Sequence, residues 1–497
     1  MYETNNKDQG NLSVQAETVV LDGIMKELPE KILIVSDLHL NIGRDPDTGT
    51  YSLIENFLAG EAFTGWLKYY RDHAPKPALL VLNGDIFDFD RVSAIPETDK
   101  DFTDWSEYLE RLGVKKSPAE LRKSVNRVEK RYGLRTHDYK TAWKLMRIFS
   151  GHAAFFKALA TWLTAGGRLV FVKGNHDLEL HWPLVRRAIR AELVAQGSDA
   201  DQTQDHVAFC DDGFTIGNVY IEHGHQYEEI TRVEGGPVLD NKPDQINLPL
   251  GSFINRYCVN KIERLDPFID NIKPITGALL ALLRATPLSV FKIYCRAWRF
   301  ICRALVMRRV FNSAFFLVLA GLIVPVAALI FLAVLLASQA ARLWVTDWIP
   351  GWLQISGIIG GILFPIILPY LIGAVLEIIR QLPFFKSKNH LREQVKKKLD
   401  EVFSGYTQAS TVYAAMGHTH VQDVLKLADL PLGQFYVDSG AWIPLWPENR
   451  RDLIGRTIYS YISFDSDIKG VYSKESLQWD DHAEKPRDAQ ILVSPFR

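Results

Sequence analysis

The feature that most constrains this sequence is a series of strand-length apolar runs, each followed at once by Asp, Asn or His side chains. In the first, Lys31–Val35 leads into Asp37 and His39. Runs of this kind are typical of strands buried on both faces, and open α/β sheets bind their ligands at the ends of such strands. The four later runs are 78–83 with Asp85 and Asp88, 168–173 with Asn175, His176 and Asp177, 219–222 with His223 and His225, and 412–416 with His418 and His420. Packing does not require polar groups at five strand ends, so the pattern predicts one metal centre.

The polar residues at these strand ends form an ordered set of motifs. They read D-x-H, G-D-x-x-D, G-N-H-D, H and G-H-x-H along the chain. In this order the sequence resembles the calcineurin-like metallophosphoesterases over residues 31–225 and 412–440. It is more distantly similar to the UDP-2,3-diacylglucosamine pyrophosphatases, which carry Arg where this chain has His176. The resemblance implies a four-layer α/β/β/α sandwich and a metal-dependent phosphoric ester hydrolase.

The resemblance also implies two divalent metal ions and assigns their ligands. The first set is Asp37, His39, Asp85 and His420, and the second set is Asp85, Asn175, His223 and His418. Asp85 belongs to both sets because a carboxylate has two oxygens and can bridge two ions. Oxygen and imidazole donors suit Mn²⁺, which is the expected ion, and they also suit Fe, Zn or Co ions.

The remaining polar residues are expected to act around the metal ions. Two adjacent ions can share a hydroxide at neutral pH and hold a phosphate for in-line attack, so no Ser or Cys nucleophile is needed. His176 is predicted to protonate the leaving group, with Asp177 orienting its ring, and the alternative for His176 is a structural histidine. Asp88 is expected to support an imidazole ligand. His225 is expected either to support a ligand or to contact the substrate.

Length and hydropathy indicate more than one structural unit. A chain of 497 residues exceeds the usual size of a single domain. No charged residue lies between positions 309 and 342 or between positions 347 and 377, and each stretch exceeds the ~20 apolar residues that span a bilayer. The predicted units are two phosphoesterase parts, 1–240 and 401–497, and between them a membrane-associated insertion, 241–400, with a transmembrane hairpin at about 313–338 and 352–376. The alternative is a helical hairpin buried in a soluble protein.

Charge and cysteine content bound the location and the partners. Basic residues flank both ends of the predicted hairpin, and its central turn is nearly neutral. By the positive-inside rule, the catalytic domain and both termini are predicted to lie on the cytoplasmic side of the cytoplasmic membrane, with the lipid bilayer as a partner. A net charge of −1 gives no bias toward nucleic acid. Four cysteines without a C-x-x-C pair argue against a disulfide framework or a thiolate metal site.

The predicted function is a membrane-bound phosphoesterase that uses two metal ions to hydrolyse a phosphoester or pyrophosphate of a lipid-linked or amphipathic substrate. One alternative is a phosphatase or phosphodiesterase for nucleotides or phosphoprotein, with the hairpin only as an anchor. An alternative of another class is an inactive membrane scaffold, although a complete ligand set favours an enzyme. The charged stretch 91–137 is expected to be a solvated helical excursion or a cap over the site. Residues 139–165 are predicted to form one helix that ends at Gly166 and Gly167.

Overall fold

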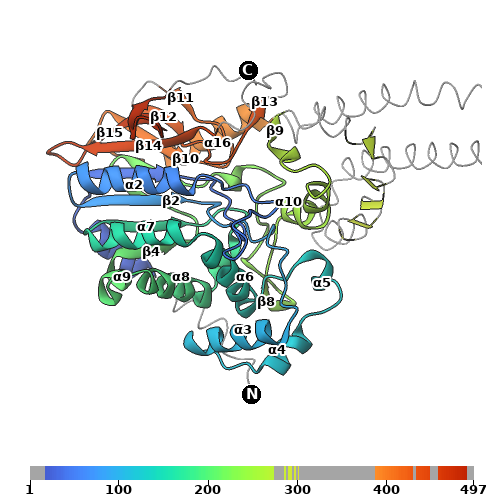
Figure 1. Cartoon of the computed structure of the whole chain (residues 1–497). Coiled ribbons are helices and arrows are strands. Elements are labelled where there is room, and N and C mark those ends of the chain that lie inside the picture. Colours follow the sequence, from blue (N-terminus) through green and yellow to red (C-terminus); the bar gives the residue numbers. More distant parts are fainter. Residues whose placement is uncertain are drawn as a thin grey trace, which may run out of the picture.

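The chain forms a mixed α/β fold with two main sheets (Figure 1). The computed structural model describes residues 17–273, 387–428, 432–447 and 457–489, together with single positions between 282 and 300. The seven-stranded sheet has the order β16-β15-β14-β1-β2-β3-β4, and the five-stranded sheet has the order β11-β12-β10-β6-β5. Two further sheets, β13-β9 and β7-β8, have two strands each.

The strands of each sheet have the following bounds. The first sheet contains β1 (Lys31–Val35), β2 (Ala78–Asn83), β3 (Arg168–Val172), β4 (Val207–Cys210), β14 (Tyr459–Ser466), β15 (Tyr472–Asp480) and β16 (Lys485–Asp488). The second contains β5 (Gly213–Ile216), β6 (Val219–Glu222), β10 (Thr411–Met416), β11 (Asp423–Ala428) and β12 (Gly433–Asp438). The small sheets contain β7 (Val238–Leu239), β8 (Lys242–Ile246), β9 (Ile272–Lys273) and β13 (Trp446–Pro447).

Helices connect and cover these strands. The α-helices with described bounds are α2 (Gly60–His73), α3 (Asp99–Arg111), α4 (Pro118–Ser124), α5 (Glu129–Tyr132), α6 (Asp138–Gly151), α7 (Ala153–Thr164), α8 (Pro183–Ala195), α9 (Ala200–His206), α10 (Leu250–Ile254), α11 (Asn260–Ile262) and α16 (Ser387–Val402). Shorter turns of helix are η1 (Leu178–His181), η2 (His225–Tyr227), η3 (Asn255–Val259) and η4 (Ile269–Asn271). The stretch 91–137 therefore contains three helices, α3 to α5.

The five apolar runs predicted to be strands are all strands, namely β1, β2, β3, β6 and β10. The first three are parallel neighbours in one sheet, and β6 and β10 are parallel neighbours in the other. All six residues of β2 are buried, as expected for a strand covered on both faces. Because parallel strands end at the same edge of a sheet, the loops that follow them meet there.

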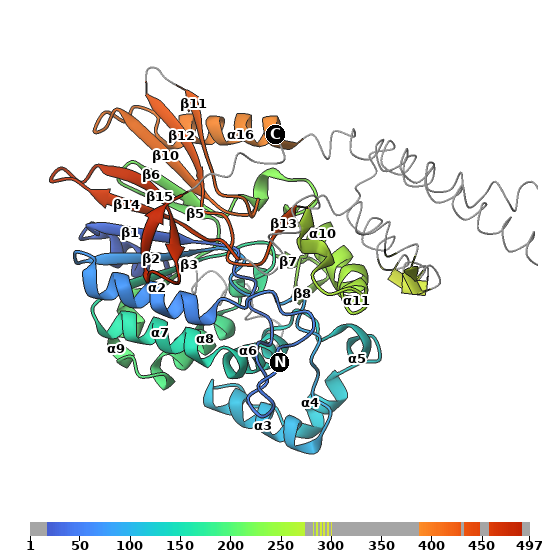
Figure 2. The same ribbon diagram turned by 45° about the horizontal axis from the view of Figure 1, so that its top comes forward.

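Three apolar cores fix the order of the layers. Leu33 of β1 packs with helix residues such as Phe63 of α2 in the first core. Its neighbour Ile34 points to the opposite face and packs with Ile221 of β6 in a second core between the sheets. The helix α16 covers the other face of the five-stranded sheet through a third core. The order is therefore helices, seven-stranded sheet, five-stranded sheet and α16, and Figure 2 shows α2, α7 and α9 on one side of the sheets and α16 on the other.

The structure does not support the predicted transmembrane hairpin. Among the described residues, no helix is long and apolar enough to cross a membrane. The longest helix with described bounds, α16, has 16 residues and a lysine-rich face, whereas a spanning helix needs ~20 mostly apolar residues. The predicted spans 313–338 and 352–376 lie outside the described residues. The predicted two-pass location, with a cytoplasmic catalytic domain and termini, is withdrawn for the same reason. The domain limits at 240 and 400 remain a prediction.

The predicted single helix at 139–165 is instead two helices, α6 and α7, which meet at His152. The loop after β1 lies directly against this junction. The backbone N–H of Arg44 donates to the carbonyl of Gly151, and a Cβ added to Gly151 would lie 1.9 Å from the carbonyl oxygen of Ile42. This close approach between two backbones is a tertiary contact that helix periodicity alone does not predict.

Candidate metal centre

The loops after five parallel strands bring the predicted ligands together. Within the described residues, three groups of His and Asp side chains could each hold a metal ion, and in each group the candidate ligand atoms lie within 4.8 Å of one another. The groups are Asp37 with His39 and His420, His39 with Asp85 and His176, and Asp85 with His223 and His418. Because His39 and Asp85 each belong to two groups, the three groups form one connected centre.

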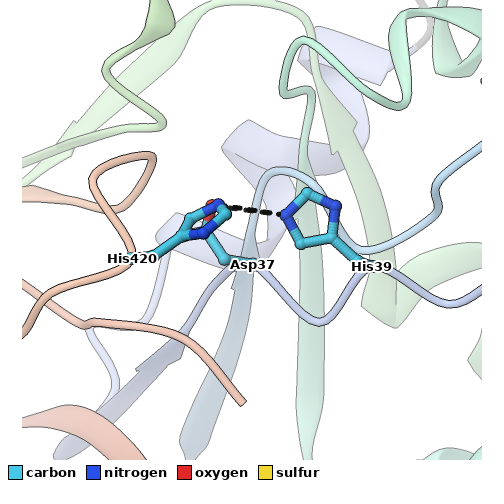
Figure 3. A group of neighbouring side chains, drawn as sticks. All are labelled: Asp37, His39 and His420. Atoms are coloured by element: carbon cyan, nitrogen blue, oxygen red, sulfur yellow. Dashed lines mark hydrogen bonds and ion pairs between the residues drawn. The ribbon is translucent and has the colours of Figure 1, made fainter. Parts of the chain in front are cut away.

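The first group lies where the loop after β1 meets the loop after β10 (Figure 3). The Nε2 atoms of His39 and His420 are 3.1 Å apart, and Asp37 Oδ1 lies 3.3 Å from His420 Nε2. Asp37 is fully buried, and its Oδ1 accepts no hydrogen bond. Two imidazole nitrogens at this distance repel each other unless a proton or a cation lies between their lone pairs. A cation beside a buried carboxylate satisfies all three side chains.

The group of Asp85, His223 and His418 has the same character. His223 Nδ1 lies 2.8 Å from the carbonyl oxygen of Asn83, so this nitrogen carries the hydrogen and donates it. The other nitrogen, Nε2, then faces Asp85 Oδ2 at 3.1 Å. Burial lowers the pKa of His223, but the carboxylates of Asp85 and Asp37 outweigh burial and raise this pKa to about 10. The carboxylates thus demand a positive charge at this point, which a proton or a metal ion can provide.

Asp85 occupies the middle of the centre. Its Oδ1 accepts a hydrogen bond of 2.8 Å from the backbone N–H of His176, and its Oδ2 faces His223. Two glycines leave room for this carboxylate and its partner. A Cβ at Gly174 would lie 2.2 Å from Asp85 Oδ1, and a Cβ at Gly84 would lie 2.4 Å from the His223 ring. The glycines of the G-D and G-N motifs are therefore required by close packing around the site.

Five of the candidate ligands have a left-handed backbone. These residues are Asp37, His39, Asp85, His418 and His420, with φ between 51° and 71°. Only two other non-glycine residues of the described chain, Phe268 and Glu484, have positive φ. Each such conformation costs on the order of 1 kcal/mol and persists where the surrounding structure imposes it, commonly at functional sites. The fold therefore holds the ligand loops in a strained shape that places their side chains toward one point.

Asp88 connects two of the histidines. Its Oδ2 lies 3.2 Å from Nδ1 of His39, and its Oδ1 lies 3.1 Å from Nδ1 of His176. The hydrogen bond at His39 Nδ1 and the ion pair at His176 Nδ1 fix the ring orientations and leave both Nε2 atoms for other partners. Asp177 has a different role from the one expected, because it accepts hydrogen bonds from the backbone N–H groups of Gly174 at 2.6 Å and Ile86 at 2.9 Å. Asp88, and not Asp177, is the carboxylate on the His176 ring.

The charge of His176 follows from its surroundings. Burial lowers its pKa, but Asp88 and Asp85 together raise the pKa to about 10. His176 is therefore protonated at neutral pH in the protein without metal. A cation bound at Asp85 would offset the negative charge of that carboxylate and bring this pKa down toward neutrality.

Asn175 and His225, also predicted for the site, are both buried. The side-chain oxygen of Asn175 accepts no hydrogen bond, so it is open to a ligand that attracts oxygen. The His225 ring lies 5.5 Å from the His223 ring and belongs to none of the three groups. Burial lowers the pKa of His225 well below its usual range, so its ring is neutral.

Two further contacts at the site were not foreseen from the sequence. Glu228 Oε2 lies 3.1 Å from Nε2 of His418, and the Thr231 hydroxyl lies 3.3 Å from the same atom. The Ser36 hydroxyl donates to Asp37 Oδ2 and lies 2.6 Å from the Ser439 hydroxyl. Ser36 is adjacent to a predicted ligand and could have been suspected, but Glu228 lies in a polar loop without a motif.

Neither the protein-family models nor the curated proteins gave a match to this sequence, so its family remains a prediction from the motifs.

Proposed function

We propose that the chain is a metal-dependent phosphoric ester hydrolase of the calcineurin-like kind, which uses two divalent cations. The observation that carries the proposal is the position of Asp85, whose Oδ2 lies 4.0 Å from His39 Nε2 of one proposed ligand set and 3.1 Å from His223 Nε2 of the other. One carboxylate between two groups of donors is the arrangement that a pair of ions needs. The oxygen and imidazole donors favour Mn²⁺, with Fe, Zn or Co ions as further candidates.

The donor atoms fit such ions. The buried side-chain oxygen of Asn175 accepts no hydrogen bond, and Asp37 Oδ1 and His223 Nε2 each face only another candidate ligand, His420 and Asp85. Buried polar atoms in native proteins nearly always have a partner, so their coincidence at one site supports a bound cation. The proposed ligand sets are Asp37, His39, Asp85 and His420 for one ion, and Asp85, Asn175, His223 and His418 for the other.

Two such ions, when bound, supply a water of lowered pKa and positive charge for the phosphate oxygens. The chain's own residues orient the histidine rings, donate a proton to the leaving group and position the loops. Asp88 holds the rings of His39 and His176 through their Nδ1 atoms. His176 is proposed to give a proton from Nε2 to the oxygen of the leaving group, since a departing alkoxide needs one. Asp177 keeps the loops after β2 and β3 in register through its backbone hydrogen bonds.

The substrate class is a phosphoester or a pyrophosphate. The preference for lipid-linked substrates depended on the predicted hairpin, so the proposal does not include it. Nucleotides and phosphoproteins remain within the class.

The test is metal-dependent hydrolysis by the full-length protein. The protein is stripped with a chelator, reloaded with Mn²⁺, Fe²⁺, Zn²⁺ or Co²⁺, and assayed on aryl phosphates, sugar nucleotides, nucleotides and phosphopeptides. We expect the metal to restore hydrolysis and Asp85→Asn to reduce turnover by about 10³-fold or more, because that variant removes a charge shared by both ions. Asp240→Asn, at an exposed carboxylate, is the matched control. A reloaded protein without hydrolysis on any substrate would instead support an inactive scaffold.

A further inference from the structure

The segment from α10 to α11 lies along one side of the metal centre. The Ser252 hydroxyl lies 3.5 Å from the carbonyl oxygen of Asn175, and Asn255 Nδ2 lies 3.5 Å from Nε2 of His176. Asn260 Nδ2 donates a hydrogen bond of 2.7 Å to the carbonyl of Asp90. Figures 1 and 2 both show α10 at the end of the sheets where the site loops lie. This segment therefore forms a wall beside His176.

Contacts with the residues at the end of α5 fix the position of this wall. Arg256 is buried, and its Nη2 donates to the carbonyls of Gly133 and Leu134 at 2.5 Å each. The Tyr257 ring lies 4.9 Å from the Tyr132 ring in an edge-to-face contact. These contacts join the wall to the stretch 91–137 next to α5. A side chain on the inner face of such a wall is held in a defined position relative to His176.

On this wall, Asn255 is the residue whose side chain faces Nε2 of His176. The Nδ1 atom of His176 is engaged by Asp88 at 3.1 Å, so Nε2 is the nitrogen left for the leaving group. Asn255 lies at the start of a π-helical turn, Asn255–Val259, and such turns are frequent at functional sites. It is partly exposed, and its 3.5 Å contact with His176 is long for a hydrogen bond. A leaving-group oxygen that approaches His176 Nε2 from the exposed side would therefore lie beside the Asn255 carboxamide.

We infer that Asn255 determines specificity by binding a hydroxyl group of the leaving group next to His176. This inference rests on the proposed function and names the class of ester that the site prefers. A carboxamide both donates and accepts, so it pairs with a hydroxyl in either direction. A leaving group with a hydroxyl close to the ester oxygen would bind Asn255 while His176 donates its proton to the ester oxygen. An alkyl leaving group of the same size without hydroxyls would leave the carboxamide unpaired.

The test uses pairs of esters that differ only in their hydroxyl groups. The first pair is glycerol 1-phosphate and propyl phosphate, and the second pair is the symmetric diesters of the same two alcohols. The compound p-nitrophenyl phosphate is a further probe whose leaving group has no additional hydroxyl. For the wild-type protein loaded with metal, we expect kcat/KM to be higher for the glycerol ester than for the propyl ester. Asn255→Leu has a similar volume but no hydrogen-bonding group, and it should lower kcat/KM about tenfold for the glycerol ester only. Asn247→Leu is the matched control, because the Asn247 amide donates only to the backbone carbonyls of Glu234 and Gly236.

The outcomes separate this inference from the proposed function. Equal losses on the glycerol and propyl esters in Asn255→Leu, or no wild-type preference for the glycerol ester, would overturn the inference and leave the hydrolase intact. Absence of metal-dependent hydrolysis of every ester by the wild-type protein would overturn the proposed function, and the inference with it. Metal content and thermal unfolding of each variant show whether a loss arises from misfolding.

Discussion

Two regions of this protein bury charged side chains, and they do so in opposite ways. Beside α5 and α6, Lys140 is buried and donates to Glu129 at 2.7 Å and to the carbonyl of Ser124 at 2.8 Å. Glu129 also accepts backbone hydrogen bonds from Asn126 at 3.0 Å and Arg135 at 2.9 Å. Both of these charges therefore have partners within the protein.

In the metal centre this internal compensation is incomplete. The buried side-chain oxygen of Asn175 accepts no hydrogen bond there, and the two facing nitrogens of His39 and His420 are 3.1 Å apart. Burying charge is costly in both regions unless something offsets it. At Lys140 and Glu129 the protein provides the whole offset, whereas the metal centre leaves part of it to a ligand. The comparison separates a structural ion pair from a binding site by the partners that each charge has.

The largest expected effect on stability is at the ion pair. Lys140→Met keeps much of the side-chain volume but leaves Glu129 buried without its cation, so the free energy of unfolding should fall by about 3–5 kcal/mol. The binding of metal per folded molecule should stay at the wild-type level, because Lys140 contacts no candidate ligand. Chemical denaturation and metal analysis of the same sample measure both quantities. Loss of metal without loss of stability would mean that the two regions are not separate.

A smaller effect on stability is expected at Asp90. This residue is a buried carboxylate, as Glu129 is, but it lacks hydrogen-bond partners. It belongs to none of the three groups. Burial, followed by the nearby carboxylate of Glu179, raises the pKa of Asp90 to about 7 from its usual 3.8. The folded protein therefore holds this proton more tightly than the unfolded chain does. Between these two pKa values the unfolded chain ionises first, so stability is lost as the pH rises and the loss is complete above pH 7.

The Asp90→Asn substitution removes the ionisable carboxyl group and with it the loss of stability at high pH. We expect the variant to gain on the order of 1–2 kcal/mol over the wild-type protein at pH 8, and little at pH 4. Urea denaturation of the chelated proteins at both pH values measures the difference. Equal gains at the two pH values would mean that Asp90 does not titrate in this range, and a constant loss would mean that the carboxylate has a partner.

The sequence predicted the strands and the His and Asp side chains that meet in the three groups better than the contacts between separate loops. The strands β1, β2, β3, β6 and β10 were found because apolar runs and the polar residues after them are local patterns. The pairing of His176 with Asp88 and of His418 with Glu228 depends on how separate loops meet, so the motifs did not reveal it. The break at His152 lies against a loop that is far away in the sequence, and local helix periodicity contains no information about that contact.

The transmembrane hairpin is an error of another kind, because the sequence predicted an element that the structure does not support. It was predicted from uninterrupted apolar composition, which says that a segment avoids water but not where it lies. No helix in the described ranges supports it. The motif at a strand end is more informative, because it combines an element with a position at the edge of a sheet.

The most direct test of the account is the number of metal ions that the protein binds. The full-length wild-type protein and the Asp85→Asn variant are stripped with a chelator, reloaded with Mn²⁺, freed of excess ion and analysed by mass spectrometry for metal per chain. The account predicts about two ions per wild-type chain and a clear loss in the variant, because one carboxylate serves both ions. A wild-type protein that retains no ion, or a variant that retains as many ions as the wild type, would contradict it.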